Sequence, residues 1–246
     1  MIMKPRERAV KLAIVVVLAG TTLVLAESRK DYRFKVGRHA SVTVMNQYGP
    51  ISVKPGAVKE VMVTATTYSD KVEVDHSQSG SRIDIVSHLL PGVDEQSGRV
   101  EYEVLVPPDA SVTLHSINGP LHAERLHGDV TLEGANANVD VREISDAHVH
   151  IKTLNGLVTL TGIRDGHVEI TSVGGDVVMN SVNGPLVHTA PPGKNDDVII
   201  HEHRRPLRVA LLAVIVGVRD RRGVRAADAA DDPRHLSADP RPAESP

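Results

Sequence analysis

The chain has 246 residues, a formal net charge of −3, no cysteine, no tryptophan and a single phenylalanine. The lack of cysteine excludes disulfides, cysteine-based zinc sites, iron–sulfur clusters and thiol nucleophiles. A near-neutral charge without a basic run argues against a nucleic-acid partner. The sequence also carries no dinucleotide or phosphate-binding fingerprint, so we expect no small-molecule cofactor.

Residues 1–26 are predicted to form a secretory signal peptide. Basic residues from Lys4 to Lys11 precede an apolar run from Leu12 to Leu25, and Ala26 provides the small residue of a cleavage site. An uncleaved membrane anchor is the alternative, although the apolar run is shorter than the ~20 residues that span a bilayer. We therefore expect export to the periplasm or the surface of a bacterium.

Residues 27–115 are predicted to be rich in β-strands. Short runs alternate apolar and polar residues, with glycine and proline between them. No stretch after the predicted signal peptide has a helical period. We expect this region to cap the regular repeat that follows and to carry all the aromatic side chains. The predicted strands include Val42–Val44, Ile51–Val53, Val61–Thr64, Val72–Val74, Ile83–Ile85 and Tyr102–Val104.

Residues 116–193 contain a repeat. Glycine or alanine recurs at steps of nine or ten residues, so two steps make a unit of about 19 residues with two short strands. Asn-Gly and Asp-Gly pairs provide the tight turns between the strands. The pattern predicts an all-β fold, a two-sheeted parallel β-solenoid with about 19 residues per coil. The repeating positions are Gly119, Gly128, Ala137, Ala147, Gly156, Gly166, Gly175 and Gly184.

Stacking one unit on the next tests this prediction. Every position that is predicted to point inwards is apolar except His188, and the residues between them are polar. Aliphatic side chains suit a core between two close sheets, where large rings would force the sheets apart. The inward columns are Leu121/Val139/Val158/Val177, Ala123/Val141/Leu160/Met179, Val130/Val149/Val168/Leu186, Leu132/Ile151/Ile170/His188 and Leu126/Ile144/Ile163/Val182.

Residues 194–246 have a different composition, dominated by arginine, alanine, aspartate and proline. Two prolines before Gly193 are expected to end the ladder, because proline cannot donate a hydrogen bond to it. The tail has too little apolar surface for a core and is predicted to be disordered. Leu207–Val218 is the exception, and it suits a buried strand or an amphipathic cap.

The order of several motifs resembles the bacterial putative-adhesin domain family, whose domains have no known function. The resemblance covers Tyr32 to Pro192 and rests on Val104–Val112 (VLVPPDASV), Ser116–Gly119 (SING), the recurring VNG turns and the opening Val42–Tyr68. It implies a right-handed β-solenoid exported from a bacterium, with no established catalytic residues. Members of the family usually continue the ladder beyond the position of His188, where this chain has prolines.

A group of histidines is the strongest candidate for a functional site, a metal-binding site. Stacking the repeats places His148 beside His167 and His150 beside Glu169 on the outer face of one sheet, close enough for two or three of them to share Zn²⁺ or Ni²⁺. The alternative is a solvated polar surface that is rich in histidine. Acidic residues are scattered, so no carboxylate pair indicates a hydrolase.

The sequence therefore predicts an exported, non-enzymatic module for adhesin-like or structural interactions in the bacterial cell envelope. Its expected partner is an envelope protein or polysaccharide, and the solenoid ends could also mediate self-association. Two alternatives remain open. One is a polysaccharide-active β-helix enzyme, and the other is a metal-responsive envelope accessory protein.

Overall fold

The structure is a computed structural model that describes residues 27–92, 94, 97–189, 198–201 and 219–220. The predicted signal peptide and the Leu207–Val218 segment lie outside these residues. Within the described part of the chain, the regular elements are all strands, and no helix is long and apolar enough to cross a membrane. The prediction of an all-β fold is therefore confirmed for these residues.

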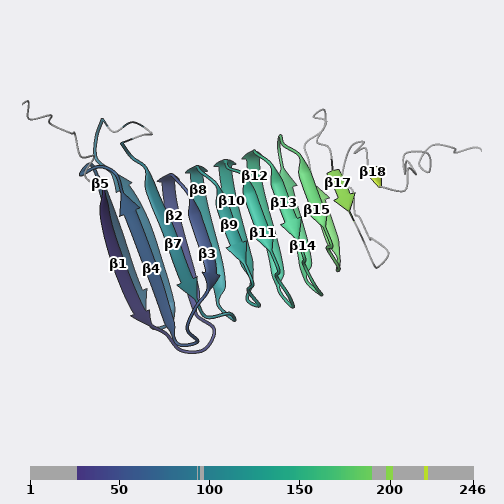
Figure 1. The fold of residues 1–246 in the computed structure, drawn as a ribbon, viewed down its shortest axis with the longest axis horizontal. Helices are drawn as coiled ribbons and strands as arrows, with labels where there is room; N and C mark the ends of the chain where they lie inside the picture. The colour runs from purple at the N-terminus through teal and green to yellow at the C-terminus, as the bar shows by residue number, and fades with distance from the viewer. Residues whose placement is uncertain (1–26, 93, 95–96, 190–197, 202–218, 221–246) are drawn as a thin grey trace, which may run out of the picture.

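Two mainly parallel sheets lie face to face in an elongated stack, which runs in Figure 1 from the purple N-terminal strands to the green C-terminal ones. In spatial order, sheet A contains β1 (Ser28–Lys35), β4 (Glu60–Thr67), β7 (Val100–Val106), β3 (Ile51–Pro55), β9 (Leu121–Glu124), β11 (Val139–Arg142), β13 (Val158–Thr161), β15 (Val177–Asn180), β17 (Val198–His201) and β18 (Arg219–Asp220). Sheet B contains β16 (Leu186–Thr189), β14 (His167–Ser172), β12 (His148–Asn155), β10 (Val130–Asn136), β8 (Ser111–Asn118), β2 (Ser41–Tyr48), β6 (Arg82–Leu89) and β5 (Val72–Ser79).

From β8 to β16 the chain alternates between the two sheets. From β10 to β16, each strand pairs in parallel with the strand two elements earlier, as in the register Val112–Val130–Val149–Val168. This register matches the spacing that the sequence predicts. All residues of the predicted inward columns are buried, and His188 is buried with them. Valine, isoleucine and leucine thus fill the space between the sheets.

The N-terminal region is part of the same two sheets. β2 pairs in parallel with β8, and β3 pairs in parallel with β9, so they extend the ladders of the repeat. β4 to β7 are inserted between β3 and β8 in the sequence, and β6 and β7 lie beyond β2 and β3 in space. The predicted boundary between residues 115 and 116 falls inside β8.

The antiparallel strands β1, β4 and β5 lie at the N-terminal end of the stack. There the ring centroids of Tyr32 and Phe34 lie 4.6 and 5.6 Å from that of His76. Two of the aromatic side chains therefore lie at this end, whereas Tyr102 is buried on β7 between the sheets.

At the other end, β17 lies within the segment that the sequence assigns to the tail. Its backbone pairs in parallel with β15, in the register Val177↔Val198. The expectation that the ladder ends before Lys194 therefore differs from the structure. Prolines interrupt a ladder only where they stand, and the β-branched run Val198–Ile200 has the residues that a strand favours.

The chain crosses between the sheets at two kinds of corner. From sheet A to sheet B it passes the apolar corner, where a buried aliphatic side chain fills each crossing. A residue in the left-handed region, with φ between 53° and 71°, precedes each of these side chains. The apolar corner consists of Arg125–Leu126, Glu143–Ile144, Gly162–Ile163 and Ser181–Val182.

Candidate functional site

From sheet B to sheet A the chain passes a different corner, which is built mainly from asparagine and glycine. The parallel register stacks its crossings directly on one another, with Asn118 opposite both Tyr48 and Asn136, and Asn136 opposite Asn155. We call this the asparagine corner. Its segments are Tyr48–Pro50, Asn118–Pro120, Asn136–Asn138 and Asn155–Leu157.

Close stacking at the asparagine corner depends on glycine. Gly156 has φ of 137°, and a Cβ added there would lie 2.1 Å from the Ala137 carbonyl oxygen. An L-residue would therefore be strained by its backbone conformation and would clash with the preceding crossing. This requirement accounts for the Asn118-Gly119 and Asn155-Gly156 pairs of this corner.

A ladder of side-chain amides runs along this corner. Asn136 Nδ2 donates to Asn118 Oδ1 at 2.9 Å, and Asn155 Nδ2 donates to Asn136 Oδ1 at 3.0 Å. Each amide has two N–H donors and an oxygen with two acceptor sites, and a ladder link uses one of each. The ladder thus leaves hydrogen-bonding capacity at the surface.

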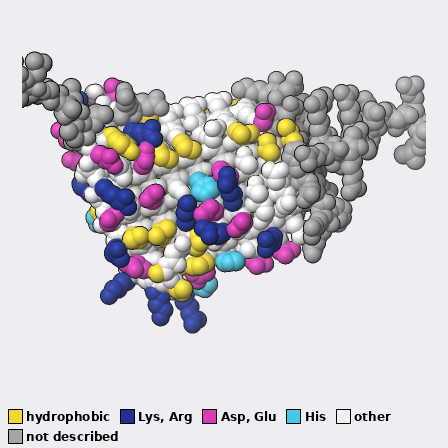
Figure 2. All heavy atoms as spheres, viewed as in Figure 1, with side chains coloured by type: hydrophobic (Ala, Val, Ile, Leu, Met, Phe, Trp, Pro, Cys, Tyr) yellow, Lys and Arg dark blue, Asp and Glu magenta, His cyan; other side chains and the backbone are white. Residues whose placement is uncertain are grey.

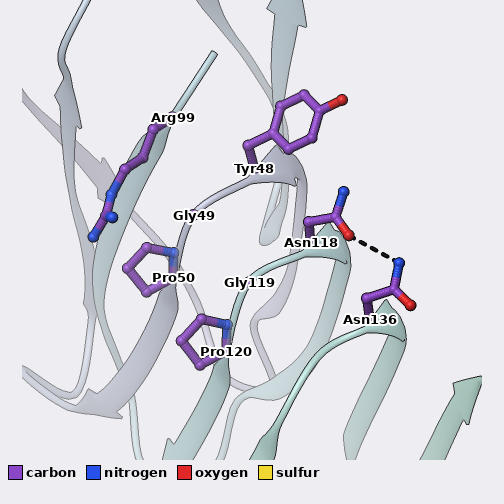
Figure 3. Close-up of a pocket in the computed structure, with 8 residues that line it drawn as sticks. All are labelled: Tyr48, Gly49, Pro50, Arg99, Asn118, Gly119, Pro120 and Asn136. Atoms are coloured by element: carbon purple, nitrogen blue, oxygen red, sulfur yellow. Dashed lines mark hydrogen bonds between the residues drawn. The ribbon is translucent and has the colours of Figure 1, made fainter. Parts of the chain in front are cut away.

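Two hollows lie along the asparagine corner. The first has a volume of about 620 Å³ and the second about 360 Å³. They share Gly119, Pro120 and Asn136, so we treat them as one open groove, the corner groove, part of which is shown in Figure 3. The first hollow is lined by Tyr48, Gly49, Pro50, Arg99, Asn118, Gly119, Pro120 and Asn136, and the second adds Ala137, Asn138, Asn155 and Gly156.

Tyr48 occupies the position of an asparagine at the N-terminal end of the ladder. Its ring lies close to Gly98, where an added Cβ would be 3.0 Å from Tyr48 Cδ2. Arg99 lies on the other side of Gly49 and Pro50 in Figure 3. Its guanidinium donates to Glu101 Oε1 at 2.6 Å, so the only charged side chain that lines the groove has an ion-pair partner.

The predicted histidine cluster lies on the outer face of sheet B, and the expected neighbours are adjacent. The ring centroids of His148 and His167 are 5.8 Å apart, and His150 Nδ1 lies 3.3 Å from Glu169 Oε2. His148 Nδ1 also lies 3.3 Å from Asp129 Oδ1. Among the described residues, no three histidine or acidic side chains converge to hold a metal ion.

A further histidine, His122, lies in a charged network on the outer face of sheet A that the sequence does not predict. His122 bridges Asp140 and Glu124 at 3.2 and 3.3 Å. Burial raises the pKa of Glu124, but hydrogen bonds from Arg125 and His122 together with the positive charges of Lys54 and Arg125 lower it by more, so the net pKa lies below its usual value. Figure 2 shows acidic and basic side chains intermixed over the middle of the visible face.

The corner groove also escapes prediction from the sequence. Its formation requires Tyr48 to lie against Asn118, although the inserted strands β4 to β7 separate them in the sequence. A signal is present, because Tyr48-Gly49-Pro50 and Asn118-Gly119-Pro120 share the Gly-Pro pair and each precedes a strand. Aligning these two segments would place Tyr48 on the amide ladder.

No model of a protein family matches the chain, and no curated protein matches it. Several solved structures are similar. A putative adhesin from Bacteroides fragilis has a TM-score of 0.46 and 12% identity, covering 78% of this chain and 96% of that chain. A putative cell adhesion protein from Clostridium sporogenes has a TM-score of 0.34 and 10% identity, covering 65% of this chain and 73% of that chain. A putative adhesin from Parabacteroides distasonis has a TM-score of 0.34 and 12% identity, covering 78% of this chain and 96% of that chain. These names match the family that the sequence resembles.

Proposed function

We propose that this chain is an exported, non-enzymatic module for adhesin-like or structural interactions in the bacterial cell envelope. The observation that carries the proposal is the open corner groove, which presents uncharged hydrogen-bonding groups along the stacking direction of the strands. The partner is an envelope polysaccharide or an envelope protein. Self-association through the ends of the stack is a further mode of interaction.

The fold that presents this groove is, in our proposal, a right-handed two-sheeted β-solenoid with about 19 residues per coil. The alternation of strands between two parallel ladders supports it. The proposed layout places a signal peptide over 1–26 before the stack, and β17 carries the ladder past residue 193 into the segment predicted as the tail. An experimental structure of the full chain would test the winding and its hand.

The lining of the groove favours binding over catalysis. The described residues that line it include neither a carboxylate nor a histidine, the groups that most often carry protons in enzyme active sites. Its one cation is paired with Glu101. A polysaccharide-active enzyme would need an acid and a base on either side of the scissile bond.

A binding screen tests the proposal. The purified protein is mixed with peptidoglycan, envelope polysaccharide and intact cells, and light scattering follows its mass. We expect saturable binding to at least one of these. A protein that stays monomeric and binds none of them would contradict the proposed function.

A metal-responsive accessory protein is a second candidate, favoured by the 5.8 Å separation of the His148 and His167 rings. It predicts that Zn²⁺ or Ni²⁺ raises the melting temperature of the protein. It also predicts that a His148→Ala/His167→Ala double variant loses this increase. An unchanged melting temperature with both metals would contradict it.

A further inference from the structure

We propose that the corner groove binds a linear, uncharged polysaccharide, with Tyr48 packing against a sugar ring and the amide ladder bonding to hydroxyl groups. This inference rests on the proposed function and specifies the class of its ligand.

The geometry of the groove suits a polymer with a regular repeat. Asn118, Asn136 and Asn155 stand in register on neighbouring parallel strands, so their amides recur at the strand spacing of about 4.8 Å. The two hollows follow one another along this line and share lining residues. A chain could therefore extend across several crossings of the corner, instead of ending in a closed pocket.

The chemistry of the lining matches that of a neutral sugar. Hydroxyl groups both donate and accept hydrogen bonds, and a primary amide offers both functions in one plane. Sugar rings also present apolar C–H faces, for which the rings of Tyr48, Pro50 and Pro120 provide apolar surface. The backbone at Gly98 lies close to one edge of the Tyr48 ring.

The charge of the groove disfavours an anionic polymer. Arg99 is the one charged side chain of the lining, and Glu101 Oε1 accepts hydrogen bonds from both its Nε and its Nη2, at 3.1 and 2.6 Å. A second acidic group would have to compete with this carboxylate. The remaining lining residues carry no charge at neutral pH.

The backbone at the corner disfavours an extended peptide. Peptides that add to a sheet bond to unpaired backbone groups at its edge. Here the backbone bonds run between crossings, with Gly49 N donating to Asn118 O at 2.9 Å and Ala137 N donating to Asn155 O at 3.1 Å. A ligand in the groove must therefore bond mainly to side chains.

Isothermal titration calorimetry of the full chain tests the inference. The probes are a neutral glucan oligosaccharide, a neutral N-acetylglucosamine oligosaccharide, a uronic acid oligosaccharide and an unstructured peptide. We expect one of the two neutral sugars to bind more tightly than the uronic acid oligosaccharide and the peptide. Tyr48→Ala should weaken that binding about tenfold or more, because it removes the only aromatic ring of the lining.

Two further variants separate binding from folding. Asn118→Asp keeps the acceptor of the Asn136 hydrogen bond but replaces a donor by a charge, so it should weaken binding with little change in melting temperature. Lys152→Ala, on the outer face of sheet B, is the control and should bind as the unaltered protein does. Equal affinity in Tyr48→Ala, Asn118→Asp and the control would overturn the inference.

The other outcomes are also decisive. Preference for the uronic acid oligosaccharide or the peptide overturns the inference, and so does the failure of both neutral sugars to bind. If envelope material still binds to the groove variants with unchanged affinity, the proposed function stands and only the ligand class and site are wrong. If no envelope material binds to the unaltered protein, the proposed function fails as well.

Discussion

Both corners of this molecule carry the chain from one sheet to the other, but one is apolar and the other is lined mainly by asparagine and glycine. At the apolar corner, aliphatic side chains such as Ile144 and Ile163 are fully buried and fill the crossing. At the asparagine corner, the crossings are held by glycine, backbone hydrogen bonds and an amide ladder, and the space beside them is an open groove. One corner therefore contributes mainly to stability, whereas the other leaves surface for a ligand.

The difference also appears in the backbone. At the apolar corner, non-glycine residues such as Arg125 and Glu143 adopt φ values of 55° and 53°. Left-handed conformation costs roughly 1–2 kcal/mol per L-residue, and burial of the next aliphatic side chain contributes about 1.5–3 kcal/mol. At the asparagine corner the only buried apolar side chain of the four segments is the methyl group of Ala137, and the residues with positive φ are Gly49, Gly119 and Gly156. Hydrophobic burial thus allows a freer choice of residue at the apolar corner.

The largest effect is expected for Gly156→Ala at the asparagine corner. The added Cβ would lie 2.1 Å from the Ala137 carbonyl oxygen at a φ of 137°, so the crossings must separate. We expect a loss of about 4 kcal/mol of unfolding free energy, measured by urea denaturation. The control is Gly80→Ala, where φ is 62° and nothing lies within 4 Å, and a loss of about 1 kcal/mol is expected. Equal losses would show that close stacking is unimportant.

A smaller loss is expected at the apolar corner. Ile163→Ala removes a fully buried side chain that packs between the sheets. It should lower the unfolding free energy by about 3 kcal/mol, the usual cost of such a cavity. Ile117→Ala, next to the asparagine corner, removes a side chain that is 41% exposed and should cost no more than about 0.5 kcal/mol. If both variants unfold at the same urea concentration, the apolar corner does not have the stabilising role we assign to it.

The amide ladder gives a finer test. Asn136→Ala removes two ladder hydrogen bonds, and Asn118→Ala removes one. Because the ladder is exposed to water, we expect losses of about 1 kcal/mol and about 0.5 kcal/mol of unfolding free energy, respectively. The double variant should lose less than the sum, since the two residues share a bond. Additive losses in thermal denaturation would argue against a connected ladder.

The contrast between the corners also shows what the sequence could predict. The apolar corner could be predicted because its column, Leu126 to Val182, repeats with the coil period and stays apolar. The neighbours His148 and His167 followed from the same period. The positive φ of Arg125 and Glu143 could not be predicted, because local preference disfavours it and packing overrides that preference. The groove could not be predicted either, because it requires β2 to pair with β8 across an inserted segment.

The smallest expected effect concerns acid stability near the apolar corner. Glu124 immediately precedes Arg125. Burial raises the pKa of Glu124, but the hydrogen bonds from Arg125 and His122 and the positive charges of Lys54 and Arg125 together keep it below the usual 4.5. A carboxyl group with a lowered pKa in the folded state stabilises the fold above its unfolded pKa, and this contribution is lost as the pH falls through the folded value. We therefore expect the urea midpoint of the unaltered protein to fall more steeply than that of Glu124→Gln below pH 4.5. Since the network lies on the outer face of sheet A, the difference should be small and should shrink in high salt. Parallel curves for the two proteins would mean that the Glu124 network does not contribute to stability. The buried aliphatic side chains would then be sufficient to stabilise the apolar corner.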